Sequence, residues 1–332
     1  MHCELVVPAL FAAREIPRLP SLELLLARGR PAQADPLSLE AWLGEGFGVG
    51  EDMPPAGAIT LLAAGPRDDA RTASWVRADP VHLRLGGDRF ALIPGAACGI
   101  SHEEADSFVA ALNRDFEGRC FFVVVRPDQW CMQMTGDTPL EAAAPLEVAA
   151  QEGGAGLPGG TDSPHWLALL NEIQMALHGH PLNAEREQRG APVINSVWLW
   201  GAGRLPQDAE GPWHSLTTDD ALAAGFAQLA RMRQRAVPAS AAEWLERAPL
   251  EGRHLVVLDS LRSVLALSGP EQHADRLATL EARWFAALLE ALRSGRVGMV
   301  TVHACDSGWS YETVRSDLRR FWRRARPLAA YT

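Results

Sequence analysis

The sequence predicts an α/β fold: a mainly parallel sheet between helices, with a small α+β unit inserted into it. Two observations favour this class. Short buried runs at 254–258 and 297–302 alternate with amphipathic helical stretches, which is typical of a parallel sheet covered on both faces. Residues 79–150 lack that alternation and contain two pairs of strands around one helix. A chain of 332 residues is long enough for two domains or for one domain with an insertion.

In the first part of the chain, residues 4–8 are expected to form a short buried strand. A helix follows over 20–29, with Ser21 as its N-cap and Gly29 as its C-cap. A further helix is expected over 36–44, where Ser38 would serve as a surface or capping serine.

The inserted unit is expected to begin with a hairpin over 79–93, in which two alternating runs flank a Gly-Gly-Asp turn. A helix follows over 101–115, and its Ser101 and Glu104 match a capping box. The unit continues with strands at 119–125 and 129–134 and a Gly- and Pro-rich return linker at 153–164.

The rest of the core again alternates helices with strands, which predicts parallel pairing. The expected helices cover 164–178, 219–235, 271–294 and 310–324, and the expected strands cover 193–200, 254–259 and 297–302.

The strand over 193–200 is the predicted centre of the sheet. Trp198 and Trp200 are two residues apart, so both side chains point to one face, where we expect them to pack against helix 164–178. Glycines follow the strand and allow a sharp turn or a close backbone approach. Ligands of open α/β sheets bind beyond the carboxyl ends of strands, so one tryptophan could instead line a pocket there.

Composition excludes some classes of function. The hydrophobic content of 47% and charged content of 22% are those of an ordinary globular protein. A formal net charge of −10 argues against a general nucleic-acid-binding protein. The arginine-rich stretch 315–326 is more simply explained as a solvated helical face. No apolar run approaches the roughly 18 residues that span a bilayer, so no membrane segment is expected.

The cysteines indicate a reducing compartment. There are five of them, widely spaced and without a Cys-x-x-Cys pair, which favours buried thiols in a cytoplasmic protein. No signal peptide is recognised, because Glu4 and Pro8 interrupt the short N-terminal apolar run. All 31 basic residues are arginine.

A paired motif suggests a family. His-Pro-Leu-Asn-x-x-Arg over 180–186 leads into Asn-Ser-Val-Trp-Leu-Trp-Gly-x-Gly over 195–203. This segment resembles the archaeal-type, cofactor-independent phosphoglycerate mutases of the alkaline-phosphatase-like superfamily. The Trp-Leu-Trp-Gly version, with Phe-Trp-Arg-Arg at 321–324, looks most like bacterial regulatory proteins of the RpfE type. The resemblance implies an alkaline-phosphatase-like core formed by 1–77 and 158–332, with 79–150 as the inserted subdomain.

The resemblance also implies where catalysis would take place, and the sequence departs from the family there. The enzymes end their first strand on an Asp metal ligand, whereas this chain has Pro8, Ala9 and Leu10, whose side chains cannot bind a cation. The position of the Ser or Thr nucleophile falls on Ala34. Loss of these groups should abolish a two-metal phosphoryl-transfer site.

Two residues of the expected metal set remain at strand ends. Asp259 and His303 each follow a buried strand, as metal ligands of the superfamily do, and His273, Asp275 and Asp306 lie near them in the sequence. The simpler interpretation is that Asp259 caps a helix and that His303 is a hydrogen-bonded histidine at the end of a strand.

Three polar residues match the family motif one by one: Asn183, Arg186 and Asn195. Hydrogen bonds from these side chains to the backbone would hold the loop that enters the central strand. An anion site that uses Arg186 is the alternative.

These observations predict a phosphoglycerate-mutase-like pseudoenzyme with a regulatory or binding role, without a cofactor, acting on an unknown protein or small ligand. The regulatory role comes from the resemblance alone. A metal-dependent phosphoglycerate mutase or phosphatase with a rearranged site is the alternative, and it would hold two ions within about 4 Å of each other. The sequence names no catalytic residue. Its candidates for ligand binding are Asn183, Arg186, Asn195, Asp259 and His303.

Overall fold

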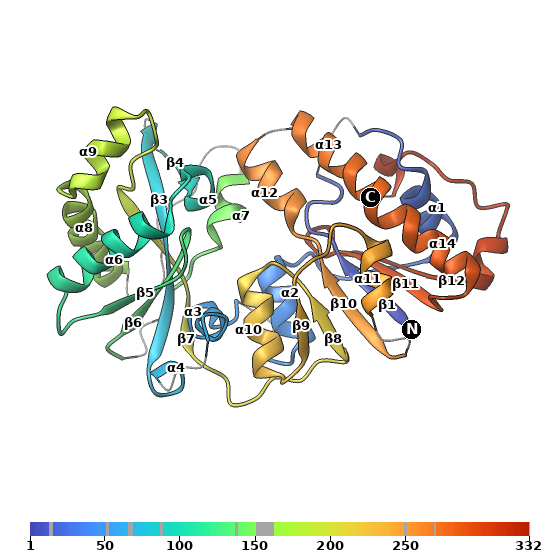
Figure 1. Ribbon diagram of the computed structural model, residues 1–332, viewed down its shortest axis with the longest axis horizontal. Coiled ribbons are helices and arrows are strands. Elements are labelled where there is room, and N and C mark those ends of the chain that lie inside the picture. Colours follow the sequence, from blue (N-terminus) through green and yellow to red (C-terminus); the bar gives the residue numbers. More distant parts are fainter. Residues whose placement is uncertain are drawn as a thin grey trace. The chain divides into compact units, whose positions relative to one another are not determined.

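The structure is a computed structural model that describes residues 1–12, 16–50, 53–65, 69–86, 89–136, 139–150, 163–248, 251–268 and 270–331. The chain forms two compact units (Figure 1). Unit 1 comprises Met1–Gly48 and Glu210–Thr332, and unit 2 comprises Val49–Ala209. No helix in the described part of the chain is both long enough and apolar enough to cross a membrane.

The described strands of unit 1 form a seven-stranded sheet in the order β2-β12-β11-β1-β10-β8-β9. Strands β11, β1, β10, β8 and β9 run parallel, and β12 and β2 are antiparallel additions at one edge. The bounds are β1 His2–Val6, β2 Arg30–Gln33, β8 Ser215–Thr217, β9 Arg233–Arg235, β10 Arg253–Val257, β11 Met299–Ala304 and β12 Trp309–Val314.

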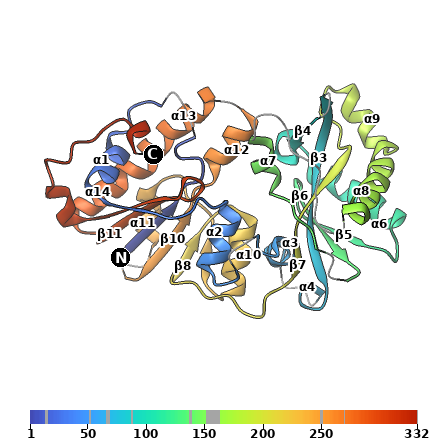
Figure 2. The same ribbon diagram turned by 180° about the vertical axis from the view of Figure 1, so that it is seen from behind.

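Helices cover both faces of this sheet. On one face, Cys3, Leu5 and Val7 of the first strand segment share an apolar core with α1, α11, α13 and α14. On the other face lie α2 and α10 (Figure 2). The rings of Phe47 at the end of α2 and Phe226 of α10 are stacked on each other. The bounds are α1 Pro20–Arg28, α2 Leu39–Gly46, α10 Ala221–Leu229, α11 Ala241–Arg247, α12 Ser260–Leu267, α13 Pro270–Leu280, a π-helical turn Glu281–Phe285 and α14 Ala286–Ser294.

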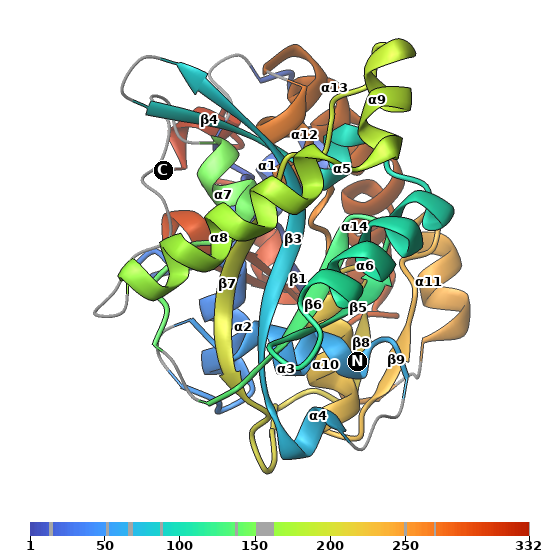
Figure 3. The ribbon, with the colours of Figure 1, turned by 90° about the vertical axis from the view of Figure 1, so that its left-hand side faces the viewer.

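Unit 2 is built on an antiparallel sheet in the order β4-β3-β6-β5, with β7 also paired to β3. Helices α6 and α8 pack on one face of it (Figure 3). The strands are β3 Ser74–Gly86, β4 Arg89–Pro94, β5 Phe121–Arg126, β6 Gln129–Met134 and β7 Ser196–Arg204. The helices are α3 Ala56–Leu62, α4 Asp69–Thr72, α5 Gly95–Cys98, α6 His102–Asp115, α7 Pro145–Ala150, α8 Ser163–His178 and α9 Pro181–Gln188.

The tryptophan-rich strand does not belong to the parallel sheet, so the predicted position of 193–200 is wrong. In β7, Trp198 lies opposite Asp79 of β3, and the two strands are antiparallel. The chain therefore returns to unit 1 after β7 rather than before it. Unit 2 extends over 49–209, beyond the predicted insertion 79–150 at both ends.

The tryptophans of β7 are buried as predicted, but their predicted partner is wrong. Val197 and Leu199 share the apolar core with Trp166 of α8. Alternation along a strand then places Trp198 and Trp200 on the opposite face, and each is 3% exposed. The indole Nε1 of Trp198 donates to the Ala143 carbonyl at 2.9 Å.

The predicted closing helix over 310–324 is also wrong. Its first third belongs to strand β12, and a short 3₁₀ turn over Arg315–Arg319 follows. The Thr313 hydroxyl donates to the Leu25 carbonyl at 2.9 Å, which fixes the strand against α1. Two of the clustered arginines also bind backbone there: Arg320 donates to the Arg28 carbonyl at 3.0 Å and Arg323 to the Gly29 carbonyl at 2.7 Å.

Smaller differences concern helix ends. Helix α1 is not capped by Ser21: its first amides at Ser21 and Leu22 donate to the carboxylate of Glu281, at 2.7 and 3.1 Å. The predicted helix 219–235 ends at Leu229, and β9 follows it. The capping box of α6 and the capping role of Ser38 are confirmed. Most of the predicted linker 153–164 lies outside the described residues.

Candidate functional site

The carboxyl edge of the parallel sheet in unit 1 gathers polar groups from four strands. Ala9 follows β1, Asp220 follows β8, Asp259 follows β10 and Asp306 follows β11. Parallel strands end at the same edge of a sheet, and ligands of open α/β sheets bind there. This edge is therefore the candidate site of unit 1.

The backbone at Ala9 is strained and is held by two side chains. Its φ of +61° lies in the left-handed region that residues with a Cβ rarely adopt. The Ala9 amide donates to Asp306 Oδ2 at 3.0 Å, and its carbonyl accepts from His273 Nε2 at 2.8 Å. A carboxylate and an imidazole of the types that bind metals thus hold the main chain at this turn.

His273 has a second nitrogen with a different environment. The side chain is fully buried, and a carbonyl can only accept, so Nε2 carries the proton. Its Nδ1 has no hydrogen-bond partner among the described residues. Burial lowers the pKa of His273, which favours the neutral ring.

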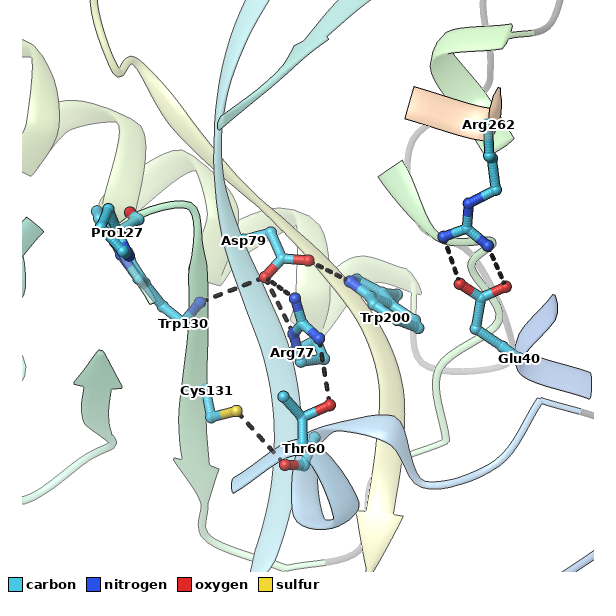
Figure 4. Close-up of polar contacts among 10 residues, drawn as sticks. Glu40, Thr60, Arg77, Asp79, Pro127, Trp130, Cys131, Trp200 and Arg262 are labelled. Atoms are coloured by element: carbon cyan, nitrogen blue, oxygen red, sulfur yellow. Dashed lines mark hydrogen bonds and ion pairs between the residues drawn. The ribbon is translucent and has the colours of Figure 1, made fainter. Parts of the chain in front are cut away.

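A buried ion pair lies beside these groups. The Arg262 guanidinium of α12 donates to both oxygens of Glu40 in α2, at 2.7 and 3.1 Å (Figure 4). This bidentate arrangement is the strongest geometry for an ion pair between an arginine and a carboxylate. Neither side chain is more than 15% exposed. Glu40 thereby has both of its oxygens engaged by a cation of the protein itself.

Asp259 occupies the N-cap position of α12, as predicted, but its side chain makes no capping hydrogen bond. Burial raises the pKa of Asp259 to about 6; the nearby charge of Asp220 adds to the rise and Arg262 opposes it. Asp259 is thus a half-buried carboxyl group whose charge is balanced mainly by one arginine.

His303 lies within β11, opposite Val6 of β1, rather than beyond the strand. Its Nε2 is 3.6 Å from Glu4 Oε2, which is too long for a hydrogen bond, and its ring packs 5.2 Å from that of Trp42. Among the described residues this nitrogen has no hydrogen-bond partner.

Glu4 is a buried carboxylate in β1 that several side chains contact. It accepts from Arg253 Nε at 2.7 Å and from Trp213 Nε1 at 3.0 Å. Burial alone would raise its pKa, but the contacts with His303, Arg253 and Trp213 lower the pKa of Glu4 to about 2. Glu4 therefore stays ionised at the edge of the core.

The two asparagines of the family motif lie in unit 2 and bind backbone, as expected. Asn183 Nδ2 donates to the Leu177 and Ile194 carbonyls, and its Oδ1 accepts from the Ile194 amide, all at 2.8 Å. Asn195 pairs in the same two-way manner with the amide and carbonyl of Leu83 at 2.8 Å. Both side chains fix the segment that enters β7.

Arg186 is fully buried, and each of its three side-chain nitrogens donates a hydrogen bond to a protein oxygen. Nε donates to the Pro192 carbonyl at 2.9 Å, one terminal nitrogen pairs with Glu104 at 2.7 Å, and the other donates to the Cys98 carbonyl. Glu104 also closes the capping box of α6. Because Arg186 is fully buried and each of its nitrogens already donates to a protein oxygen, its geometry favours a structural role over an anion site.

The five candidate residues thus belong to two separate clusters. Asn183, Arg186 and Asn195 lie in unit 2, and Asp259 and His303 lie in unit 1. Sequence reasoning missed Glu40 and Arg262, because 222 positions separate them and no local pattern connects them.

A buried pair in unit 2, Arg77 and Asp79, was also missed, although opposite charges two apart on a strand share a face and could have revealed it. Asp79 Oδ1 accepts from Arg77 at 3.0 and 2.7 Å, and its Oδ2 accepts from Trp200 Nε1 at 2.7 Å (Figure 4). Both charged residues are 4% exposed, so the cluster is part of the core of unit 2.

Sequence comparison finds distant relatives among the phosphoglycerate mutases, and no family model matches the chain. The 2,3-bisphosphoglycerate-independent phosphoglycerate mutase of Methanosarcina acetivorans is 23% identical over 202 residues, which are 57% of this chain and 49% of that protein. The probable mutase of Geobacter sulfurreducens is 31% identical over 74 residues, 22% of this chain and 18% of that protein. The chain thus matches about half or less of the length of these curated relatives.

The fold is shown by similarity to a solved structure. The PH0037 protein of Pyrococcus horikoshii aligns over 94% of this chain and 87% of its own, with a TM-score of 0.54 and 15% identity. A cofactor-independent phosphoglycerate mutase from Thermoplasma acidophilum covers the whole chain at a TM-score of 0.47 and 16% identity. The predicted fold class is confirmed: the chain has an alkaline-phosphatase-like α/β fold. By sequence, it is a distant homologue of the cofactor-independent phosphoglycerate mutases.

Several polar groups at the carboxyl edge are already bound to the protein itself. Ala9 offers no side-chain ligand, Asp306 and His273 are bound to the Ala9 backbone, and Glu40 is bound to Arg262. In the described part of the chain, no group of three or more His, Cys, Asp and Glu side chains could hold a metal ion.

Proposed function

We propose that this chain is a phosphoglycerate-mutase-like protein that has lost catalysis and acts by binding, in a regulatory role such as that of the RpfE type. The observation that carries the proposal is the Arg262–Glu40 pair at the carboxyl edge of the parallel sheet. The distant sequence similarity to the mutases supports the common ancestry that the proposal assumes.

The physical argument concerns charge. Two-metal phosphoryl transfer requires anionic oxygens that bind the ions and a nucleophile placed between them. Here a guanidinium neutralises Glu40, and the same cation lies close enough to Asp259 to lower its pKa. A divalent ion placed at this edge would have to displace or approach a fixed positive charge, which costs electrostatic energy in a poorly solvated place.

One observation favours the alternative, a metal-dependent phosphoglycerate mutase or phosphatase with a rearranged site. His273 Nδ1 is a buried ring nitrogen without a described hydrogen-bond partner. A neutral imidazole nitrogen of this kind is a common metal ligand.

Metal content and turnover, measured on the same preparation, separate the two functions. We expect purified protein incubated with Mn²⁺ and then desalted to retain no stoichiometric metal, and to interconvert 3- and 2-phosphoglycerate no faster than buffer. About two equivalents of metal per chain together with turnover would establish the enzyme instead.

An Arg262 variant tests the charge argument directly. Arg262→Ala removes the guanidinium that pairs with Glu40 and so makes the carboxyl edge more acidic, and we expect this variant to gain Mn²⁺ binding in a calorimetric titration. Arg276→Ala, which removes an exposed arginine from α13, is the matched control and should bind no more Mn²⁺ than the parent. Equal behaviour of both variants would remove the support that the ion pair lends to the proposal.

A further inference from the structure

Unit 1 contains a second feature of interest at the β9 edge of its sheet. A cavity of about 580 Å³ is lined by β8, β9 and α11 and by the segment between β9 and α11. Its volume falls within the range of small-molecule sites. Trp244, Leu216 and Pro238 give it apolar walls, and Ser215 and Thr217 add hydroxyl groups.

The charged side chains that line this cavity are all positive: Arg233, Arg235 and Arg247. Arg233 and Arg235 are two apart on β9, so they project to the same face. Neither forms an ion pair with a carboxylate in the described part of the chain, although the protein carries a net charge of −10. Arg235 donates to the Arg247 carbonyl at 2.8 Å, which holds its guanidinium at the end of α11. Arginine clusters of this kind bind phosphate and carboxylate groups.

The donor and acceptor roles of the Ser215 hydroxyl are fixed by its contact with His254. Ser215 Oγ is 2.8 Å from His254 Nδ1, and His254 Nε2 is 2.8 Å from the Glu251 carbonyl. A carbonyl only accepts, so the ring proton is on Nε2, and Nδ1 must accept from the Ser215 hydroxyl. Burial lowers the pKa of His254, which favours this neutral ring. Ser215 therefore turns lone pairs toward the cavity and can accept a hydrogen bond from a ligand.

We propose that this cavity binds a small phosphate monoester that carries a free hydroxyl group. The guanidinium groups of Arg233 and Arg235 pair with the phosphate oxygens, and Ser215 Oγ accepts from the ligand hydroxyl. The apolar walls exclude water from the carbon skeleton between these two groups. The site uses none of the residues at the carboxyl edge, so it goes beyond the proposed function and does not depend on the loss of catalysis there.

Calorimetric titration with three probes tests the ligand class. We expect glycerol 3-phosphate to bind most tightly, inorganic phosphate more weakly and glycerol not at all. Glycerate, titrated in the same way, distinguishes a carboxylate from a phosphate as the anion, and we expect it to bind more weakly than glycerol 3-phosphate. The absence of saturable glycerol 3-phosphate binding in the millimolar range would overturn the proposal, as would tighter binding of glycerate.

Variants locate the site. Arg233→Ala/Arg235→Ala should weaken glycerol 3-phosphate binding by about tenfold or more, because the variant loses the charge-assisted hydrogen bonds of two guanidinium groups to the phosphate. The matched control Arg30→Ala/Arg276→Ala removes two exposed arginines from β2 and α13 and should leave the affinity within about twofold of the parent. Equal weakening in both double variants would mean nonspecific charge attraction and would refute the site.

The hydroxyl contact has its own test. Ser215→Ala should abolish the preference for glycerol 3-phosphate over inorganic phosphate and leave phosphate affinity unchanged, whereas Ser215→Thr, which keeps the hydroxyl, should retain the preference. A preference that survives in Ser215→Ala would overturn the role of Ser215. Thermal melts without ligand show that each variant is folded before its affinity is compared.

Discussion

At the scale of single residues, Arg186 is the clearest case of a charge held inside the protein. All three of its side-chain nitrogens donate to protein oxygens, and Glu104 supplies the opposite charge. Removal of one partner of a buried pair leaves the other uncompensated, which costs far more than the loss of an exposed pair. Arg189, which also pairs with Glu104, is 51% exposed and offers a comparison within the same cluster.

We expect Arg186→Met to lower the free energy of unfolding by about 3–5 kcal/mol, because it removes the fully buried cation that pairs with Glu104 and leaves the Pro192 and Cys98 carbonyls without this donor. Arg189→Ala should lower it by at most about 1 kcal/mol. Urea denaturation of both variants measures the difference. Similar losses in the two would mean that Arg186 is no more important to the fold than a surface arginine.

The pKa of Glu4 predicts acid sensitivity. Its folded-state pKa of about 2 lies below the ordinary value of 4.5, so its ionised form stabilises the native state at neutral pH. That contribution, on the order of 3 kcal/mol, is lost as the pH falls from about 4.5 toward 2. We therefore expect Glu4→Gln to be less stable than the parent at pH 7 and to approach it near the acid end of this window.

Chemical denaturation at a series of pH values follows this difference. Glu290→Gln is the control, since Glu290 is 72% exposed and should show no such convergence. A constant gap between Glu4→Gln and the parent across the whole acid range would contradict the assigned pKa of Glu4.

At the scale of elements, α3 lies unusually close to the sheet of unit 2. A Cβ added at Gly57 would come within 2.6 Å of the Val76 backbone in β3. Gly201 of β7 adopts a left-handed φ of +59°, and a Cβ there would lie 2.5 Å from the Ala56 Cβ. Both glycines are therefore needed for the close approach of helix and strands.

Gly57→Ala should destabilise the protein by about 1–3 kcal/mol, since the strand backbone must shift to admit one methyl group. Gly179→Ala is the matched control: its nearest neighbours would be 4.0 Å away, and the change should stay within about 0.5 kcal/mol. Thermal or urea unfolding compares the two, and equal melting points would mean that α3 can move aside without cost.

Trp200→Ala should cost about 3–5 kcal/mol, because it removes a buried ring and leaves Asp79 without its indole donor. Trp322→Ala is the control, with a side chain that is 66% exposed. An unfolding midpoint of Trp200→Ala within about a degree of the parent would show that β7 does not depend on this ring.

Local signals predicted the elements better than their partners. The capping box of Ser101 and Glu104 and the hairpin of β3 and β4 were predictable because each lies within a few residues. Strand β7 has apolar residues on both faces. Its sequence therefore does not distinguish a central strand of a parallel sheet from an antiparallel partner of β3. Asp259 was placed correctly at the end of its strand, whereas the Glu40–Arg262 pair depends on tertiary contact and left no pattern in the sequence.

At the scale of the whole molecule, the chain leaves unit 1 after Gly48 and re-enters it at Glu210. These two points are adjacent, because the Glu210 amide donates to the Phe47 carbonyl at 3.0 Å. Unit 2 is therefore inserted between two neighbouring positions of unit 1.

Replacement of residues 49–209 by a short Gly-Ser linker should consequently leave unit 1 folded, with cooperative unfolding by circular dichroism. Deletion of 79–150, the insertion expected from the sequence, is the control. It removes most of β3 and with it the partner of β7, so it should give a poorly folded protein. Cooperative unfolding of the second deletion and not of the first would contradict the division of the chain.

The adjacency of Phe47 and Glu210 also determines how tension would travel through the molecule. A force applied to the two chain ends is transmitted from Phe47 to Glu210 through unit 1. Residues 49–209 form a loop between these two neighbouring positions and carry none of this force. Stretching would have to rupture unit 1 before any extension reached unit 2. The order of mechanical rupture is then set by the path of the chain and not by which half is thermodynamically weaker.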